Sequence, residues 1–176
     1  MIILINSLKL DLKKINHVYE FGGGYGCMAR IFSKINQNVS YTIFDTNLVN
    51  LLQYYYLKQN DLDVGFDKNH KFLLTNKFKI AKKKTKSNSL FIANWSMSET
   101  PLDFRKKIVY EMKNYENILI SFQENFENIN NLRYFKNLQS DLKSKYHFKL
   151  ILNKFYNGNI IKKEKHYFLI GKKLKI

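Results

Sequence analysis

The sequence predicts an α/β protein with a doubly wound, mostly parallel sheet and a C-terminal antiparallel hairpin strand. Three observations predict this fold class. Strand-like segments alternate with segments of helical periodicity, a glycine-rich loop follows the first strand, and two β-like segments close the chain on either side of a turn. Because 176 residues are enough for one core and short for two, we expect residues 1–176 to form a single domain.

The first part of the chain predicts two strand–helix pairs. Apolar and β-branched residues predict strands at 17–21 and 39–44, and each is followed by apolar residues at helical spacing. The first helix is predicted at 27–35. The second helix is predicted from an apolar stripe made of Leu48, Val49, Leu51, Leu52 and Tyr55. Two strands with a helix between them indicate a parallel βαβ unit.

The middle of the chain continues the alternation. Residues 70–74 form a candidate third strand, and the Lys-rich segment 82–86 is expected to be a solvated turn or loop. Strands are predicted at 89–93 and 117–122. A helix is predicted between them over about 100–114, because proline favours the first turn of a helix.

The end of the chain predicts a last helix and a hairpin. Residues 127–145 have a helical pattern. Two β-like segments, 146–156 and 164–172, flank Asn157-Gly158-Asn159, which is typical of a turn. One strand of this hairpin is therefore expected to be antiparallel to the rest of the sheet, at its edge.

The chain is strongly basic, with 30 Lys plus Arg against 14 Asp plus Glu and a net charge of +16. Such a balance can indicate a nucleic-acid or membrane-surface partner. Nearly all the cations are lysines, however, and arginine, which phosphate and base recognition favour, occurs only as Arg30, Arg105 and Arg133. Abundant Lys, Asn and Ile also follow from an AT-rich coding sequence. A nucleic-acid partner is therefore an alternative that is not favoured.

Cysteine and histidine usage gives no support for a metal site, although Asp and Glu side chains could still assemble one in space. Cys27 is the single cysteine, which excludes an internal disulfide and a Cys-based zinc cluster, and it is expected to be a small buried residue. The four histidines are scattered. His147 and His166 lie near the final hairpin, and contact between them across its strands is a hypothesis. The first residues lack a basic leader and no segment reaches transmembrane length, so a soluble cytoplasmic protein is expected.

A glycine-rich loop, Gly22-Gly23-Gly24-Tyr25-Gly26, follows the first predicted strand. Glycine permits positive φ angles and lets the backbone approach a ligand at the start of a helix, so the ligand is expected to be nucleotide-like. The register Gly24-x-Gly26-x-x-Ala29 also satisfies the dinucleotide fingerprint. The glycines alone therefore do not separate NAD from S-adenosylmethionine.

Two carboxylates favour one of these cofactors. Glu20 ends the first strand, where a buried acid is costly unless it is paired, and a cationic ligand group would pair it. S-adenosylmethionine carries an ammonium and a sulfonium, whereas Glu20 would repel a pyrophosphate. Asp45 lies 19 residues beyond Gly26, as expected for an acid that accepts hydrogen bonds from ribose hydroxyls. The alternative for Asp45-Thr46-Asn47 is to cap the helix that follows.

A second group of candidate residues, Asn94-Trp95-Ser96-Met97-Ser98-Glu99, follows a predicted strand at the sheet edge where α/β proteins bind ligands. Glu99 is a candidate general base, with a pKa that burial beside Trp95 would raise. The alternative is that Ser98-Glu99-Thr100-Pro101 caps the next helix. Trp95 itself either stacks on a ligand ring or fills the core.

These motifs resemble those of a known family. Glu20-x-Gly22-x-Gly24-x-Gly26, followed by Tyr41-Thr42-Ile43-Phe44-Asp45, is similar to motif I and the next acidic motif of the class I S-adenosylmethionine-dependent methyltransferases, which have a Rossmann-like fold. Three further segments make the chain from about residue 17 onward resemble bacterial sugar O-methyltransferases. They are Leu51-Leu52-Gln53-Tyr54-Tyr55-Tyr56-Leu57, the segment Asn94 to Glu99, and Tyr167-Phe168-Leu169-Ile170-Gly171.

The resemblance implies a cofactor, an acceptor and site residues. The cofactor is S-adenosyl-L-methionine and the acceptor is a hydroxyl of a sugar or glycan precursor, with Glu99 as the candidate catalytic residue. The implied cofactor-binding residues are Glu20, Gly22, Gly24, Gly26, Asp45, Thr46, Asn94 and Trp95. Such methyltransferases usually carry helices before the first strand, so residues 1–16 are expected to be a short N-terminal remnant of a cap.

Two other functions stay open at this point. A chain with little cover over its cofactor site could be a cofactor-binding but inactive or partial methyltransferase subunit. The net charge of +16 leaves an RNA methyltransferase as a further alternative. An NAD-dependent oxidoreductase is disfavoured by Glu20 and because the chain lacks the length for a substrate domain.

Overall fold

An eight-stranded sheet forms the centre of the molecule, which was analysed as a computed structural model that describes residues 7–78, 86–154 and 165–174. The strand order is β3-β4-β2-β1-β5-β6-β10-β9. The strands are β1 (His17–Phe21), β2 (Ser40–Phe44), β3 (Val64–Gly65), β4 (Phe72–Thr75), β5 (Lys86–Asn94), β6 (Tyr115–Gln123), β9 (Tyr146–Leu152) and β10 (His166–Lys173). Neighbouring strands are parallel except where β10 pairs antiparallel with β6 and β9. The predicted mostly parallel sheet with an antiparallel hairpin strand is confirmed. The antiparallel strand β10 is inserted between β6 and β9, however, so the edge strand is β9.

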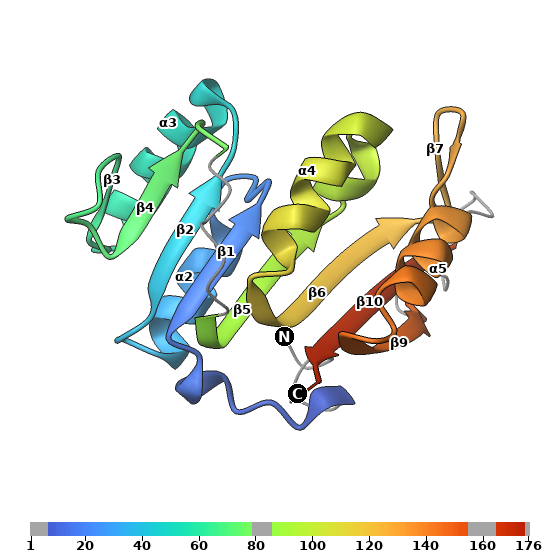
Figure 1. Cartoon of the computed structure of the whole chain (residues 1–176). Helices are drawn as coiled ribbons and strands as arrows, with labels where there is room; N and C mark the ends of the chain where they lie inside the picture. Colours follow the sequence, from blue (N-terminus) through green and yellow to red (C-terminus); the bar gives the residue numbers. More distant parts are fainter. Residues whose placement is uncertain (1–6, 79–85, 155–164, 175–176) are drawn as a thin grey trace.

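Helices cover both faces of this sheet. The helices are α2 (Cys27–Ile35), α3 (Asn47–Lys58), α4 (Leu102–Met112) and α5 (Asn131–Asp141). In Figure 1, α4 and α5 lie in front of the sheet and α2 and α3 lie behind it. Successive residues of β1 alternate between the two sides, with Val18 in the core under α2 and α3 and Tyr19 in the core under α4 and α5. The fold is therefore doubly wound.

The strongly patterned elements form where the sequence predicts them. The strand at 17–21 and the helix at 27–35 have the predicted bounds. The helix predicted at 127–145 is shorter, because a hairpin of β7 (Asn125–Phe126) and β8 (Ile129–Asn130) precedes it. The Asn130 side chain then accepts a hydrogen bond from the Arg133 backbone N–H at 2.7 Å and starts α5.

Three smaller expectations have different outcomes. His147 and His166 do not meet, because His147 pairs with Lys172 and His166 pairs with Gln123 of β6. Cys27 is only half-buried. The turn at 157–159 and most of the Lys-rich segment 82–86 lie outside the described residues, although Lys86 begins β5 and is not part of a loop.

Residues ahead of β1 take part in the core. They pass through a short 3-10 turn, η1 (Leu12–Lys14), and the buried Leu12 and Ile15 pack on the α2 side of the sheet. The Asn36 side-chain amide donates a hydrogen bond to the Ile15 carbonyl at 2.8 Å and holds this segment against the end of α2. Across the three described stretches, no helix is long and apolar enough to cross a membrane.

Helix α3 has the reverse of the usual amphipathic arrangement. The stripe that predicts it is exposed, with Leu48 78% and Tyr55 66% accessible. Its buried residues are Asn50, Gln53 and Leu57, of which two are polar. The helix is predicted correctly from its periodicity, but the apolar stripe is on its outer side.

Candidate functional site

The glycine loop joins β1 to α2 with a tight backbone. Gly22, Gly24 and Gly26 all have positive φ angles, as the sequence predicts for a loop that approaches a ligand. At Gly22 the close approach is to the protein itself, because a Cβ there would overlap the side chain of Ser96. The hydroxyl of Ser96 also donates a hydrogen bond to the carbonyl of Phe21. The loop is thus packed directly against the segment that follows β5.

A cavity of about 410 Å³, here called the loop cavity, lies at the carboxyl ends of the parallel strands. It is lined by Phe21, Gly22, Phe44, Asp45, Thr46, Asn47, Asn76, Ser96, Thr100 and Phe104. Parallel α/β sheets bind ligands at this edge, where loops from neighbouring strands converge. Of the predicted cofactor-binding residues, the loop cavity brings together Gly22, Asp45 and Thr46.

Asp45 is held in place from two sides at the wall of the loop cavity. Its Oδ1 accepts a hydrogen bond from the Thr46 N–H at 2.9 Å, and its Oδ2 accepts one from Gln53 Nε2 at 3.0 Å. Burial raises the pKa of Asp45, and these hydrogen bonds oppose the rise. The backbone N–H groups of Gly23 and Gly24 also lower the pKa of Asp45, and the carboxylate lines the cavity wall. The capping alternative is wrong, since α3 begins after Thr46 without a side-chain cap.

Glu20 lies beneath the glycine loop and does not line the loop cavity. Only 2% of it is exposed, and its Oε2 accepts a hydrogen bond from the hydroxyl of Tyr41 at 2.9 Å. Burial raises the pKa of Glu20 to about 8, against the opposing effect of Tyr41. Tyr41 is therefore an internal hydrogen-bond partner for the acid, which sequence reasoning did not find. A contact between Glu20 and a cationic ligand group stays a prediction.

Asn94 and Trp95 also lie outside the lining of the loop cavity. The Asn94 side-chain oxygen accepts a hydrogen bond from the hydroxyl of Ser121 at 2.8 Å. Trp95 has a φ of +59°, and its indole N–H donates to Nδ1 of His166 at 3.1 Å. This unusual backbone turns the chain from β5 into the 3-10 turn η2 (Ser96–Glu99), which delivers Ser96 to the cavity.

Glu99 faces a second cavity of about 500 Å³, here called the Glu99 cavity. It is lined by Glu99, Thr100, Pro101, Leu102, Asp103, Phe126, Glu127 and Ile129, so Thr100 borders both this cavity and the loop cavity. The expectation that Glu99 is buried beside Trp95 is wrong, because Glu99 is exposed and accepts a hydrogen bond from Gln123 Nε2 at 3.3 Å. The capping alternative is wrong as well, since α4 begins after Pro101 without a side-chain cap.

A buried arginine holds the segment between the two cavities. Arg105 donates hydrogen bonds to the carbonyls of Ser98 at 2.6 Å and Thr100 at 2.8 Å, and to Oδ1 of Asn131 at 2.8 Å. The ring of Tyr134 lies 4.8 Å from its guanidinium carbon. Burial lowers the pKa of Arg105. Arg105 thereby links η2 to the start of α5.

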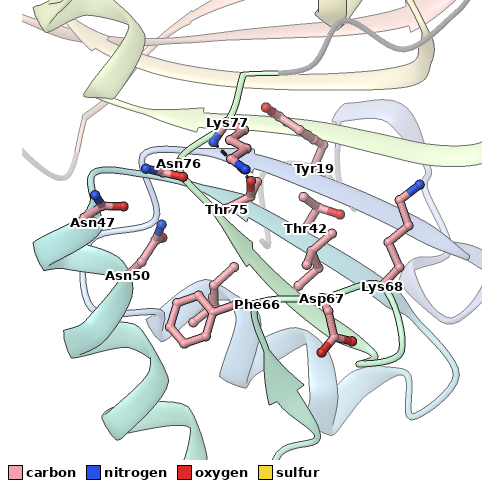
Figure 2. A pocket seen from close by; sticks show the side chains of 12 residues that line it. Tyr19, Thr42, Asn47, Asn50, Phe66, Asp67, Lys68, Thr75, Asn76 and Lys77 are labelled. Atoms are coloured by element: carbon pink, nitrogen blue, oxygen red, sulfur yellow. Dashed lines mark hydrogen bonds between the residues drawn. The ribbon is translucent and has the colours of Figure 1, made fainter.

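A third cavity, of about 420 Å³, adjoins the loop cavity through Asn47 and Asn76. Figure 2 shows that side chains of α3 and of the end of β4 surround it, with Thr42 and Tyr19 from the sheet. Two side chains of its lining carry buried polar atoms that have no hydrogen-bond partner, the Tyr19 hydroxyl and the Asn50 Oδ1. This third cavity extends the loop cavity toward strands β4 and β3, at that edge of the sheet.

Most of the loop cavity consists of residues that sequence reasoning missed. Phe44 and Phe104 are in contact through their rings, 6.4 Å apart, although 60 positions separate them in the chain. Asn76 follows the poorly patterned third strand. Phe104 and Asn76 are not part of any recognisable sequence motif. They can be assigned to the loop cavity only once the order of the strands in the sheet is known. Among the described residues, no group of three or more His, Cys, Asp or Glu side chains could hold a metal ion.

Comparison with known sequences and solved structures identifies the fold of the chain. No protein-family model and no curated protein sequence matches the chain. Solved structures do match: the methyltransferase domain of bacterial CtHen1 has 10% identity over 97% of this chain and 94% of that chain, with a TM-score of 0.65. An rRNA methylase from Streptococcus thermophilus has 11% identity over 94% of this chain and 90% of its own, with a TM-score of 0.65. The StiE O-MT has 11% identity over 97% of this chain and 71% of its own, with a TM-score of 0.67. The chain therefore has the Rossmann-like fold of class I methyltransferases.

Proposed function

We propose that this chain binds S-adenosylmethionine in the loop cavity and transfers its methyl group to a hydroxyl of a sugar or glycan precursor. The observation that carries the proposal is the loop cavity itself, which combines the glycine loop, Asp45 and Ser96 at the carboxyl edge of a class I methyltransferase fold. Its volume of about 410 Å³ lies in the range of small-molecule sites.

The chemistry of the lining supports this cofactor. The Asp45 carboxylate at the cavity wall is an acceptor for ribose hydroxyls, and the amides of Asn47 and Asn76 can bond the edge of a base. The rings of Phe44 and Phe104 offer apolar walls, which also attract a sulfonium cation. Among the described residues that line the loop cavity there is no Lys or Arg for a pyrophosphate. When bound, the cofactor supplies an electrophilic methyl group.

The Glu99 cavity is the proposed acceptor site. It carries three carboxylates, of Glu99, Asp103 and Glu127, which accept hydrogen bonds from hydroxyl groups, and the ring of Phe126 for an apolar sugar face. Thr100 lies at the border of the two cavities, so acceptor and cofactor would approach each other there. Glu99 would accept the hydroxyl proton while the acceptor oxygen takes the methyl group and the sulfur–methyl bond breaks, so that the sulfur leaves as a neutral thioether. Alignment of the acceptor would supply much of the rate.

An RNA acceptor is a second candidate. It is supported by the net charge of +16 and by Lys68 and Lys77 at the cavity that adjoins the loop cavity. The described lining of the Glu99 cavity opposes it, because three carboxylates and no cation face the space where an RNA phosphate would lie. A cofactor-binding but inactive subunit is the third candidate, since Glu99, the candidate base, is exposed.

Binding of S-adenosylmethionine tests the first step. We expect calorimetric titration to show binding to the intact chain and at least about tenfold weaker binding to Asp45→Ala, because the ribose hydroxyls lose their acceptor. Asp141→Ala is the matched control, since Asp141 is an exposed acid at the end of α5, and it should bind like the wild type. Absence of binding to the intact chain would refute the proposal.

Methylation assays test the acceptor. The purified chain should methylate an acceptor within a panel of sugars, nucleotide sugars and glycan precursors, and Glu99→Gln should keep cofactor binding while losing most of that activity. If RNA is the one acceptor that is methylated, the second candidate function, an RNA methyltransferase, would replace the sugar O-methyltransferase. Cofactor binding with no methylation of any acceptor would favour the inactive subunit.

A further inference from the structure

The outer side of α3 gathers five exposed large apolar side chains, of Leu48, Leu51, Leu52, Tyr54 and Tyr55. Leu48, Leu51, Leu52 and Tyr55 recur at i, i+3, i+4 and i+7 and form one stripe, here called the α3 outer face. Their exposed fractions are 78%, 59%, 53% and 66%. An isolated exposed leucine needs no explanation, but a continuous stripe of four such residues indicates an interaction site.

Aromatic side chains extend this face on both sides. Tyr54 stacks on Phe66 with ring centroids 5.4 Å apart, and Tyr25 of the glycine loop meets Tyr56 edge-on at 5.0 Å. Tyr25 and Phe66 are about half exposed. Together the apolar side chains expose on the order of 900 Å² per molecule, and a stable protein pair buries about 800 Å² on each partner. The face is therefore large enough for a specific interface.

We propose that the α3 outer face is a dimerisation surface, on which two copies of this chain pair their α3 helices antiparallel about a two-fold axis. The stripe is symmetric about a point between Leu51 and Leu52. An antiparallel pair centred there places Leu48 against the partner's Tyr55, and Leu51 against the partner's Leu52. A two-fold interface requires this self-complementary pattern, because each residue must fit its counterpart in both directions.

The charge distribution favours a second copy over a lipid surface. Residues 46–57 carry no charge, and residues 45–67 carry four Asp against one Lys, within a chain of net charge +16. The α3 outer face itself thus lacks the excess of cations found in the chain as a whole, and the cations beside it, Arg30 and Lys58, are held against Tyr56 and Tyr54. Antiparallel pairing also brings the acidic end of one α3, near Asp61, beside the positive N-terminal dipole of the other. An anionic membrane would be repelled by the same aspartates.

Sedimentation velocity of the whole chain tests the proposal. The wild type should change from monomer to dimer between about 1 µM and about 1 mM, and Leu51→Glu and Tyr55→Glu should each weaken the dimer by roughly a hundredfold or more, because each places two unpaired charges in the interface. Tyr110→Glu is the matched control, since Tyr110 is a 47% exposed tyrosine on α4. It should leave the dimer intact.

Cross-linking adds a test that does not depend on a disruptive charge. In a Cys27→Ser background, Leu52→Cys should be joined to its partner by a short bifunctional thiol reagent, and Tyr110→Cys should not. The proposal would be overturned if the wild type stays monomeric or if the α3 variants dimerise like the wild type. It would also be overturned if Tyr110→Glu weakens the dimer as much as the α3 variants do. A monomer that binds vesicles of anionic lipid through Leu51 and Tyr55 would assign the face to a membrane instead.

Discussion

At the scale of single residues, the site depends on the hydrogen-bond partners of two acids, Asp45 and Glu20. Asp45 is half-buried at the cavity wall and its carboxylate is kept in place by Thr46 and Gln53. Glu20 is fully enclosed, with the Tyr41 hydroxyl as its hydrogen-bond partner. The sequence predicts that a buried acid at position 20 needs a partner, and part of that need is met within the protein. The two carboxylates therefore differ in their access to ligand, since Asp45 lines the loop cavity and Glu20 does not.

The protonation of Glu20 predicts a pH-dependent loss of stability. Its pKa is raised from an ordinary value near 4.5 to about 8 in the folded chain. Between these values the folded chain holds a proton that the unfolded chain has released, so the free energy of unfolding falls as the pH rises through this window. Glu20→Gln carries no such proton. We expect Glu20→Gln to become more stable than the wild type by several kcal/mol between about pH 5 and pH 8.5, as measured by urea denaturation.

Tyr41→Phe is the companion variant for that measurement. It removes the hydrogen bond that opposes the rise in the pKa of Glu20, so the window of stability loss should extend to higher pH. A difference between Glu20→Gln and wild type that does not change with pH would show that the carboxyl group titrates normally.

At the scale of elements, the sequence predicts best where the local pattern and the tertiary contacts agree. Strand β1 and helix α2 have their predicted bounds, because an apolar run and a regular stripe leave few alternatives. The hairpin of β7 and β8 was missed because two-residue strands carry no periodicity. The burial of Glu99 was predicted from its neighbour Trp95, but the 3-10 turn η2 directs the two residues to different surroundings.

The face of a helix is harder to predict than its existence. The stripe of α3 predicts a helix, yet Asn50 and Gln53 are inside, since Gln53 bonds both the Gly24 carbonyl and Asp45. Polar side chains are thus required on the inner side of α3 to hold the glycine loop. In the same way, the loop cavity could be located from the glycines and Asp45, whereas Phe104 and Asn76 join it only through the sheet order.

The contact between η2 and α5 predicts the effect of changing Arg105. Arg105→Met would leave the carbonyls of Ser98 and Thr100 and the oxygen of Asn131 without their donor in a buried place. We expect a loss of about 3 kcal/mol in the free energy of unfolding, measured with urea. Arg105→Lys, which can restore one of these bonds, should lose less. Cofactor binding should weaken as well, since Thr100 and Ser96 line the loop cavity. Equal stability of all three proteins would contradict this prediction.

At the scale of the whole molecule, charge opposes folding. The net charge of +16 gives a self-repulsion that salt screens. One local case is Lys173, which donates a hydrogen bond to the Lys113 carbonyl at 2.9 Å. Burial first, and then the nearby charge of Lys145, lower the pKa of Lys173. Lys145 and Lys173 thus repel each other near the end of β10.

Removing one cation there should stabilise the protein at low salt. We expect Lys145→Glu to raise the free energy of unfolding by about 0.5 kcal/mol at low ionic strength, with Lys145→Gln giving about half of this. The gain should disappear near 1 M salt, where the screening length is about 3 Å. Thermal denaturation over a salt series measures both effects. A gain that persists at high salt would assign the effect to packing instead.

The position of β10 constrains the order in which the sheet is completed. β10 follows every other described strand in the chain, but it lies between β6 and β9 and bonds both of them. During synthesis β6 therefore emerges well before its neighbour, and its open edge has to wait for residues 166–173 to leave the ribosome. An open strand edge is a template for pairing with other chains. The last strand to be made thus decides whether a nascent chain closes its own sheet or becomes a substrate for chaperones and aggregation.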